Sequence, residues 1–215
     1  MYLRIFTLVL AALVVSTAAF AQDPPDQFQV AYASNIGLIP GTALTGDSYI
    51  NITNAGTVNG ADPAGEICAN VYTFDPAEEL ISCCTCLVTP NGLNSLDADA
   101  DLISNTLTPG VPTSIVIKLV ATLPIGGVCN AGNGGNPFGP TGVGVFAGGL
   151  RAWATTLHLD PLGNYQLTEN AFQNAVLSTS ENGKLTSYCN FIQANGSGFG
   201  VCKSCAAGGL GATKK

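Results

Sequence analysis

Charged side chains and histidine are scarce in this chain. Only 10% of its 215 residues are charged, seven of them Lys or Arg, and there is a single His. Nucleic-acid binding needs clustered basic side chains to neutralise phosphates, so seven bases spread along the whole length exclude nucleic acid as a partner. Disordered chains combine low hydrophobicity with high net charge, whereas 47% of this chain is hydrophobic. The acidic chain, with net charge -7, is therefore expected to fold.

An export signal is predicted at the N-terminus. Residues 1–4 carry one positive charge, residues 5–19 are apolar, and Ala19-Phe20-Ala21 has the spacing of a signal-peptidase site. Polar residues follow from Gln22, and the apolar stretch is shorter than the roughly 20 residues of a membrane anchor. We therefore expect a cleaved signal peptide over residues 1–21.

The rest of the chain is expected to form one β-rich domain over residues 22–205, followed by a flexible tail over residues 206–215. The tail is expected to be loose because it is rich in Gly and ends in two Lys. Without the signal peptide, no apolar run is long enough to span a bilayer. The expected location is secreted, extracellular or periplasmic.

Eight cysteines lie in this domain, and an even number in an exported protein is what complete disulfide pairing requires. They are Cys68, Cys83, Cys84, Cys86, Cys129, Cys189, Cys202 and Cys205.

The spacing of the cysteines limits their pairing. If residues 83–86 are extended, Cys84 and Cys86 point to one face and Cys83 to the other, so the two faces need separate partners. Cys202 and Cys205 either pair with each other or supply two partners to that cluster. A zinc site or a redox pair is the alternative, but an oxidising compartment and the lack of a neighbouring His favour disulfides.

Many short segments have the period-two alternation of strands between turn residues. They cover residues 28–32, 48–53, 67–74, 80–88, 113–123, 150–159, 165–168 and 172–177. This pattern predicts a mainly β fold, an antiparallel β-sandwich with long Gly/Asn-rich loops, stapled by disulfides.

Two connections can be predicted from local residues. Gly148-Gly149 suits a primed turn, so residues 143–147 and 150–159 are expected to form a hairpin. Residues 129–142 are Gly, Asn and Pro throughout, which predicts a surface loop that Cys129 pins.

One segment near the C-terminus has the pattern of an α-helix, at about residues 180–194. Ser178 and Glu181 have capping-box spacing. Four side chains fall on one helical stripe and are expected to be buried: Leu185, Tyr188, Cys189 and Ile192. A disulfide at Cys189 would fix this helix to the sheet.

Catalytic candidates are weak. Any triad must use His158, and Asp160, two residues on, would share its strand face, but no nucleophile elbow is present. We interpret His158 as a surface residue. Glu78 and Glu79 lack the aromatic platform expected of a glycosidase, since Trp153 is the sole Trp. No catalytic residue and no cofactor is predicted.

A weak calcium candidate lies at Asp97, Asp99 and Asp101. In an extended backbone, spacing two would direct the three carboxylates to one side, as the oxygen-rich shell of calcium requires. The EF-hand pattern fails, because Leu102 stands where Gly is required and Thr108 where the bidentate Glu should be. A solvated acidic turn is the favoured interpretation.

These features favour a secreted, non-enzymatic structural or surface protein, such as a matrix, adhesin-like or filament component, with self-association or other surface proteins as partners. One version is strand exchange, in which residues 26–34 complete the sheet of a neighbouring subunit. The alternatives are a carbohydrate- or peptide-binding module or hydrolase with a cleft near Trp153 and His158, and a Cys-cluster metal-binding or redox protein.

Overall fold

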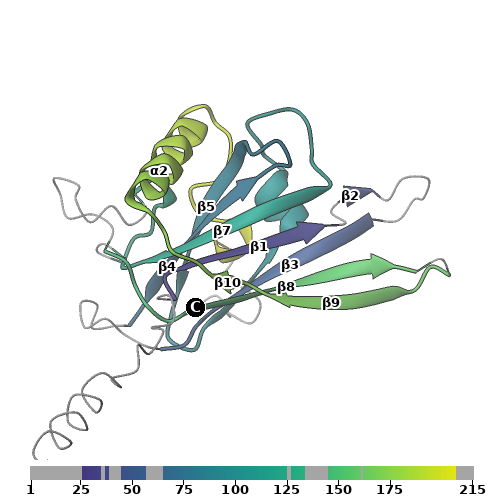
Figure 1. Ribbon diagram of the computed structural model, residues 1–215, viewed down its shortest axis with the longest axis horizontal. Coiled ribbons are helices and arrows are strands. Elements are labelled where there is room, and N and C mark those ends of the chain that lie inside the picture. Colours follow the sequence, from purple (N-terminus) through teal and green to yellow (C-terminus); the bar gives the residue numbers. More distant parts are fainter. Residues whose placement is uncertain are drawn as a thin grey trace, which may run out of the picture.

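The structure, a computed structural model, describes residues 26–34, 37–38, 45–56, 65–124, 127–133, 145–160 and 162–206. Two antiparallel sheets pack in a sandwich-like arrangement, and helix α2 (Thr179–Ala194) covers the outer face of one of them (Figure 1). The predicted fold class is confirmed. The predicted signal peptide and residues 207–215 of the predicted tail lie outside the described residues.

The sheet under α2, here called sheet A, has five strands. In spatial order they are β10 (Gln173–Asn174), β1 (Phe28–Ser34), β7 (Ser114–Thr122), β4 (Ile67–Phe74) and β5 (Leu80–Val88). Seven of the eight β4 residues are buried, because both faces of this sheet are covered.

The second sheet, here called sheet B, is built around β3 (Thr45–Asn54) and β8 (Leu150–Leu159). Its order is β6 (Leu93–Asp97), β3, β8 and β9 (Tyr165–Ala171), and the short β2 (Gly37–Leu38) also pairs with β3. Its inner face packs on sheet A and its outer face lies toward solvent.

Two hydrophobic cores follow from the alternation of the strands. Between the sheets, Ile50 and Ile52 of β3 pack with Ile117 and Leu119 of β7, all fully buried. Each such side chain contributes roughly 1.5 to 3 kcal/mol by leaving water. Lys118 lies on the opposite face of β7, as predicted.

The second core lies between sheet A and α2. Leu185, Cys189 and Ile192 of the helix pack on Tyr72 and Val120 of the sheet. The buried Tyr72 hydroxyl donates to the Ala131 carbonyl at 2.6 Å in the 3-10 helix η2 (Ala131–Asn133). Burial raises the pKa of this phenol far above its ordinary value.

Helix α2 begins as predicted: the Ser178 side chain accepts a hydrogen bond from the Glu181 amide at 3.1 Å. The predicted buried stripe is wrong at Tyr188, which is 53% exposed. The contact with sheet A is narrow enough that three apolar positions fill it, and Tyr188 borders a groove instead.

The predicted hairpin around Gly148-Gly149 is wrong. Backbone bonds join Val145 and Ala147 to the end of β7, with Leu123 N donating to Val145 O and Ala147 N to Ala121 O. β8 pairs with β3 and β9 instead. The two glycines therefore carry the chain from sheet A to sheet B, and Gly149 has the positive φ of 101° that this crossing uses.

The interpretation of Asp97, Asp99 and Asp101 as extended is also wrong. β6 ends at Asp97, and a π-helical segment, η1 (Ala98–Ile103), follows it. The apolar residues Leu102 and Ile103 are buried in the core between the sheets, which a helical turn permits and an extended strand would not.

Within the part of the chain that the structure describes, no helix has both the length and the apolar composition needed to cross a membrane.

Candidate functional site

All eight cysteines form disulfides, and none is free. Three of the four bridges start on β5, and the pairs are Cys68–Cys129, Cys83–Cys189, Cys84–Cys202 and Cys86–Cys205. The bridges to α2 and to the C-terminal segment leave β5 on opposite faces, as the alternation of an extended strand predicts. Of the two predicted pairings for Cys202 and Cys205, the one with the cluster on β5 is confirmed.

These bridges fix the C-terminal segment along β5. Val201 forms a parallel bridge with Thr85, and the amides of Phe199 and Cys202 donate to the carbonyls of Cys83 and Thr85. Gly198 approaches so closely that a Cβ there would lie 2.9 Å from the Cys83 carbonyl oxygen. The outer edge of β5 is thus covered by covalently held chain.

The sulfur atoms of Cys86, Cys202 and Cys205 lie within 4.8 Å of one another, a spacing that could suit a metal. Each of these sulfurs is already bonded to another sulfur. A metal needs thiolates, so this cluster holds the fold together and offers no metal ligand while oxidised. Four disulfides also indicate an oxidising compartment.

The three predicted calcium ligands do not converge. Asp101 is fully buried and accepts hydrogen bonds from the Ser204 amide, the Ser204 hydroxyl and the Asp97 amide at 2.6 to 2.9 Å. Asp97 caps η1 by accepting from the Ala100 amide, and Asp99 is exposed. Asp101 therefore ties η1 to the C-terminal segment.

Asp47 on β3 joins this acidic region, although the sequence gave no sign of it. Partial burial raises the pKa of Asp47 to about 6, and the charges of Asp97 and Asp99 raise it further, against the lowering effect of the Ser48 amide. The pKa of Tyr49 is raised for the same reasons, with burial first. No cation or buried unpartnered ligand marks the described part of this region as a metal site.

The cleft predicted near Trp153 and His158 is not formed. The two residues are five apart on β8, so they point to opposite faces of sheet B. Asp160 lies beyond the strand in the turn to β9, where its carboxylate accepts from the amides of Leu162 and Asn164. These hydrogen bonds, that of Asn164 first, lower the pKa of Asp160. Asp160 is thus a turn residue and not a partner for His158.

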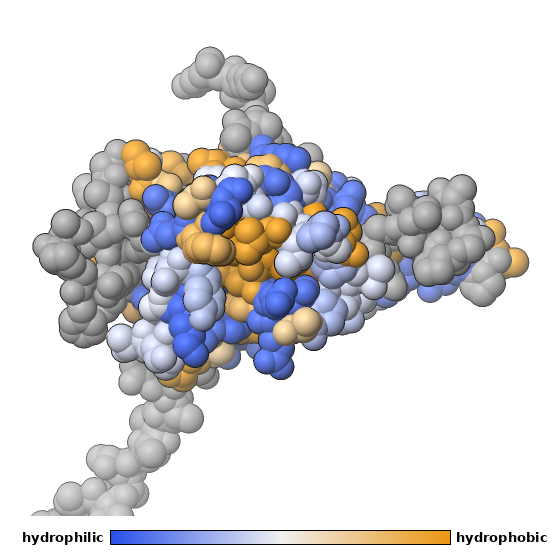
Figure 2. Space-filling model, turned by 90° about the horizontal axis from the view of Figure 1, so that it is seen from above, coloured by the Kyte–Doolittle hydropathy of each residue, from blue (hydrophilic) through white to orange (hydrophobic). Residues whose placement is uncertain are grey.

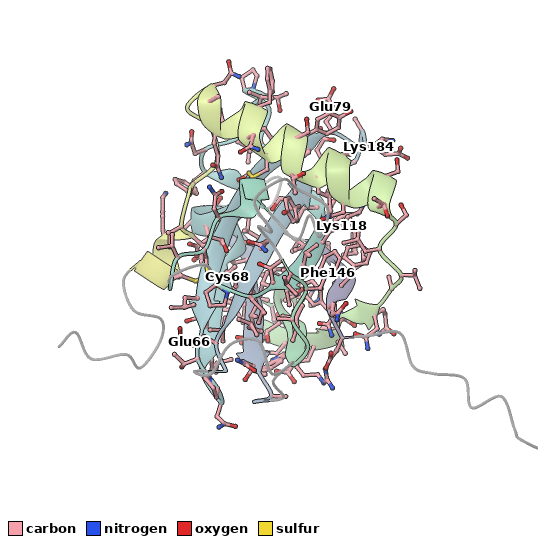
Figure 3. The ribbon with its side chains drawn as sticks, turned by 90° about the vertical axis from the view of Figure 1, so that its left-hand side faces the viewer. Glu66, Cys68, Glu79, Lys118, Phe146 and Lys184 are labelled. Atoms are coloured by element: carbon pink, nitrogen blue, oxygen red, sulfur yellow. A yellow bond between two sulfur atoms is a disulfide. The ribbon has the colours of Figure 1, made fainter. Side chains whose placement is uncertain are left out.

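A groove of about 370 Å³, which the sequence did not predict, lies between α2, β7 and the β4–β5 connection. Its lining combines apolar and charged side chains: Phe74, Asp75, Glu78, Val116, Lys118, Glu181, Lys184, Leu185 and Tyr188. In Figure 3, Lys118 lies on the sheet below α2 and Lys184 lies near the helix on the same side. The top of the molecule, seen in Figure 2, has apolar residues gathered in a hollow with hydrophilic residues around it.

The charges of this groove are largely engaged with one another. Lys118 forms an ion pair with Glu181, and its Nζ lies 4.6 Å from the centroid of the Phe74 ring. Asp75 accepts hydrogen bonds from the amides of Ala77 and Glu79 and so shapes the β4–β5 connection. Glu78 and Glu79 lie in that connection, and the groove holds no arranged nucleophile and base.

The outer face of sheet B is flat and carries aromatic and amide side chains. Asn51 pairs with Trp153, and Tyr49 with Thr155, so the two aromatic residues are diagonal neighbours on one face. The Asn51 amide donates to the Thr155 hydroxyl at 3.0 Å, and its carbonyl accepts from the Ser95 hydroxyl at 2.6 Å. This face can present stacking and hydrogen-bonding groups together.

Comparison of the chain with protein families, with curated proteins and with solved structures found no match.

Proposed function

We propose that the protein is a secreted, non-enzymatic structural or surface component, with residues 1–21 as its signal peptide. The observation that supports this best is the set of bridges on β5, which join residues 106 to 119 positions apart in the sequence. Among the described residues, by contrast, no nucleophile, base and orienting group come together. Such cross-links suit a scaffold that must persist outside the cell.

The bridges have a mechanical consequence that fits this role. A force that pulls on the C-terminal segment reaches β5 through Cys84–Cys202 and Cys86–Cys205, so the chain between these cysteines cannot extend while the bonds hold. Reduction would release about 119 residues, on the order of 400 Å of extended chain.

The test combines location with mechanics. An antibody against the folded domain should find the protein outside the cell or on its surface, and deletion of residues 1–21 should retain it in the cytosol. Single-molecule stretching between the two ends of the domain should show the additional length in reducing buffer only. Retention of the full chain in the cytosol with eight free thiols would contradict the proposal.

Carbohydrate binding is a second candidate, supported by Tyr49 and Trp153 on the outer face of sheet B. Aromatic rings on a flat surface can stack on sugar rings, while Asn51 and Thr155 can bond to hydroxyl groups. A glycan array should give hits with the wild-type protein and none with Trp153→Ala. Leu93→Ala, at the far strand of the same face, is the matched control. An array without wild-type hits would remove this candidate.

A further inference from the structure

The outer edge of β9 is a long strand edge without protection. All seven residues of β9 are exposed, and among the described strands β9 pairs with β8 alone. In Figure 1 the β8–β9 hairpin extends along the lower right margin of the molecule. Natural proteins shield such edges with Lys, Pro, a bulge or a short strand. β9 contains neither Lys nor Pro, and its register with β8 is unbroken from Tyr165 to Ala171.

The other sheet edges in the described chain are protected. The C-terminal segment covers β5 through the bridge between Thr85 and Val201. β10 has only two residues, and β6 has five and contacts helix α3 (Lys203–Ala206). Long exposure of backbone donors and acceptors is therefore a property of β9.

The backbone direction at this edge follows from one hydrogen bond. Phe172 donates its amide to the Ala152 carbonyl at 2.9 Å, and this pair continues the register of β8 and β9. Amides alternate in direction along a strand. The amide of Thr168 therefore points toward β8, while the amides and carbonyls of Leu167 and Glu169 point to the open edge.

We propose that this edge binds the same edge of a second copy of the chain, antiparallel and with the two-fold axis at Thr168. In this register Leu167 faces Glu169 of the partner subunit, and all four outward amides and carbonyls of these residues find partners in each copy. Thr168 then faces its own copy as the pair without backbone hydrogen bonds. The two sheets B become one continuous sheet.

The side chains of β9 suit this register. Opposed Thr residues are a favourable cross-strand pair, and no two like charges face each other directly. Leu167, which is 66% exposed, comes within diagonal reach of its counterpart. The Glu169 carboxylate lies 3.4 Å from the Thr155 hydroxyl on β8, away from the open edge. Because each chain carries net charge -7, added salt should strengthen the association.

This inference goes beyond the proposed function, since an enzyme or a binding module could pair in the same way. Its failure would leave the disulfide scaffold and the proposed location unaffected.

Site-specific cross-linking tests the register. The Cα atoms of a pair without backbone hydrogen bonds are about 4.5 Å apart, which a disulfide can join. With every native cysteine already bonded, Thr168→Cys should give at least tenfold more covalent dimer under mild oxidation than Val176→Cys, at a position that is 83% exposed but outside β9. Equal cross-linking of the two variants would overturn the proposal.

Sedimentation of non-cross-linked protein tests the same interface. Wild-type protein should sediment as a dimer at micromolar concentration, more completely at higher salt. Thr168→Lys opposes two ammonium groups and should weaken the dimer at least tenfold with an unchanged circular dichroism spectrum, whereas Val176→Lys should not. A monomeric wild type, or a Thr168→Lys dimer as strong as the wild type, would overturn the proposal.

Discussion

The two sheets share one core but differ in how their edges and outer faces are held. Sheet A carries four bridged cysteines on β4 and β5, has α2 on its outer face and has its β5 edge covered. The strands of sheet B contain no cysteine, and β9 is exposed along its whole length. Covalent cross-linking and edge protection therefore occur on the same sheet, and the other sheet is left open for contacts.

Removal of bridges from sheet A is expected to have the largest effect. With Cys83–Cys189 intact, Cys84–Cys202 and Cys86–Cys205 together close one loop of about 15 residues and a second of only a few. The chain-entropy relation gives a loss of about 2 kcal/mol when one of the two pairs is replaced by Ala and about 5 kcal/mol when both are. Guanidinium unfolding of the two variants measures this, and equal losses would contradict the shared-loop argument.

Asp101 joins the end of β6 to the C-terminal segment that is bridged to sheet A. Asp101→Ala should lower the free energy of unfolding by about 3 kcal/mol, because the buried amides of Ser204 and Asp97 lose their acceptor. Asp99→Ala, at an exposed carboxylate two residues away, should change it by less than about 0.5 kcal/mol. Similar losses in both variants would show that the acidic segment acts as a whole.

The acidic region of sheet B should make stability depend on pH in a direction opposite to the usual one for carboxylates. Folding raises the pKa of Asp47 from its usual 3.8 to about 6, so in this window the folded state binds more protons than the unfolded state. Stability from this group is therefore full below pH 3.8 and falls as the pH rises toward 6.

Melting curves between pH 4 and pH 7 measure this effect. Asp47→Asn should remove part of the decline, while Glu79→Gln, on the exposed β4–β5 connection of sheet A, should keep it. An unchanged pH profile for Asp47→Asn would show that Asp47 stays ionised in the folded protein.

The smallest expected change is a stabilisation of the helix over sheet A. Gly183 lies in the interior of α2 with open space around an added Cβ, so Gly183→Ala should raise the free energy of unfolding by about 1 kcal/mol. Gly198→Ala should have the opposite sign, because Gly198 has a φ of +68° and touches β5. Thermal unfolding compares them, and a destabilising Gly183→Ala would mean that α2 needs its local flexibility.

Some elements could be predicted closely from the sequence. The expected strands at residues 67–74, 80–88 and 150–159 have the observed bounds of β4, β5 and β8. Alternation and turn residues are local signals, so they define where a strand begins and ends. They do not define its neighbour, which is why β8 was assigned to a hairpin that does not form.

The candidate sites could be predicted less well. Residues 26–34 were expected to be available for exchange, but β1 pairs with β7 over all seven of its residues. A deletion of this segment would therefore remove an internal strand, which makes it a poor test of self-association. The groove beside α2 was missed because Lys118 and Glu181 are 63 positions apart in the sequence.

The sequence by itself determined that the cysteines pair, that Cys83 and Cys84 need partners on opposite faces, and that α2 can bury Cys189. These properties depend on the period of the backbone, which each segment carries alone. The tertiary structure decided which cysteines meet, that Asp101 serves Ser204, and that β9 keeps an open edge. Such contacts join residues about a hundred positions apart, so they depend on how the two sheets pack and not on any local pattern.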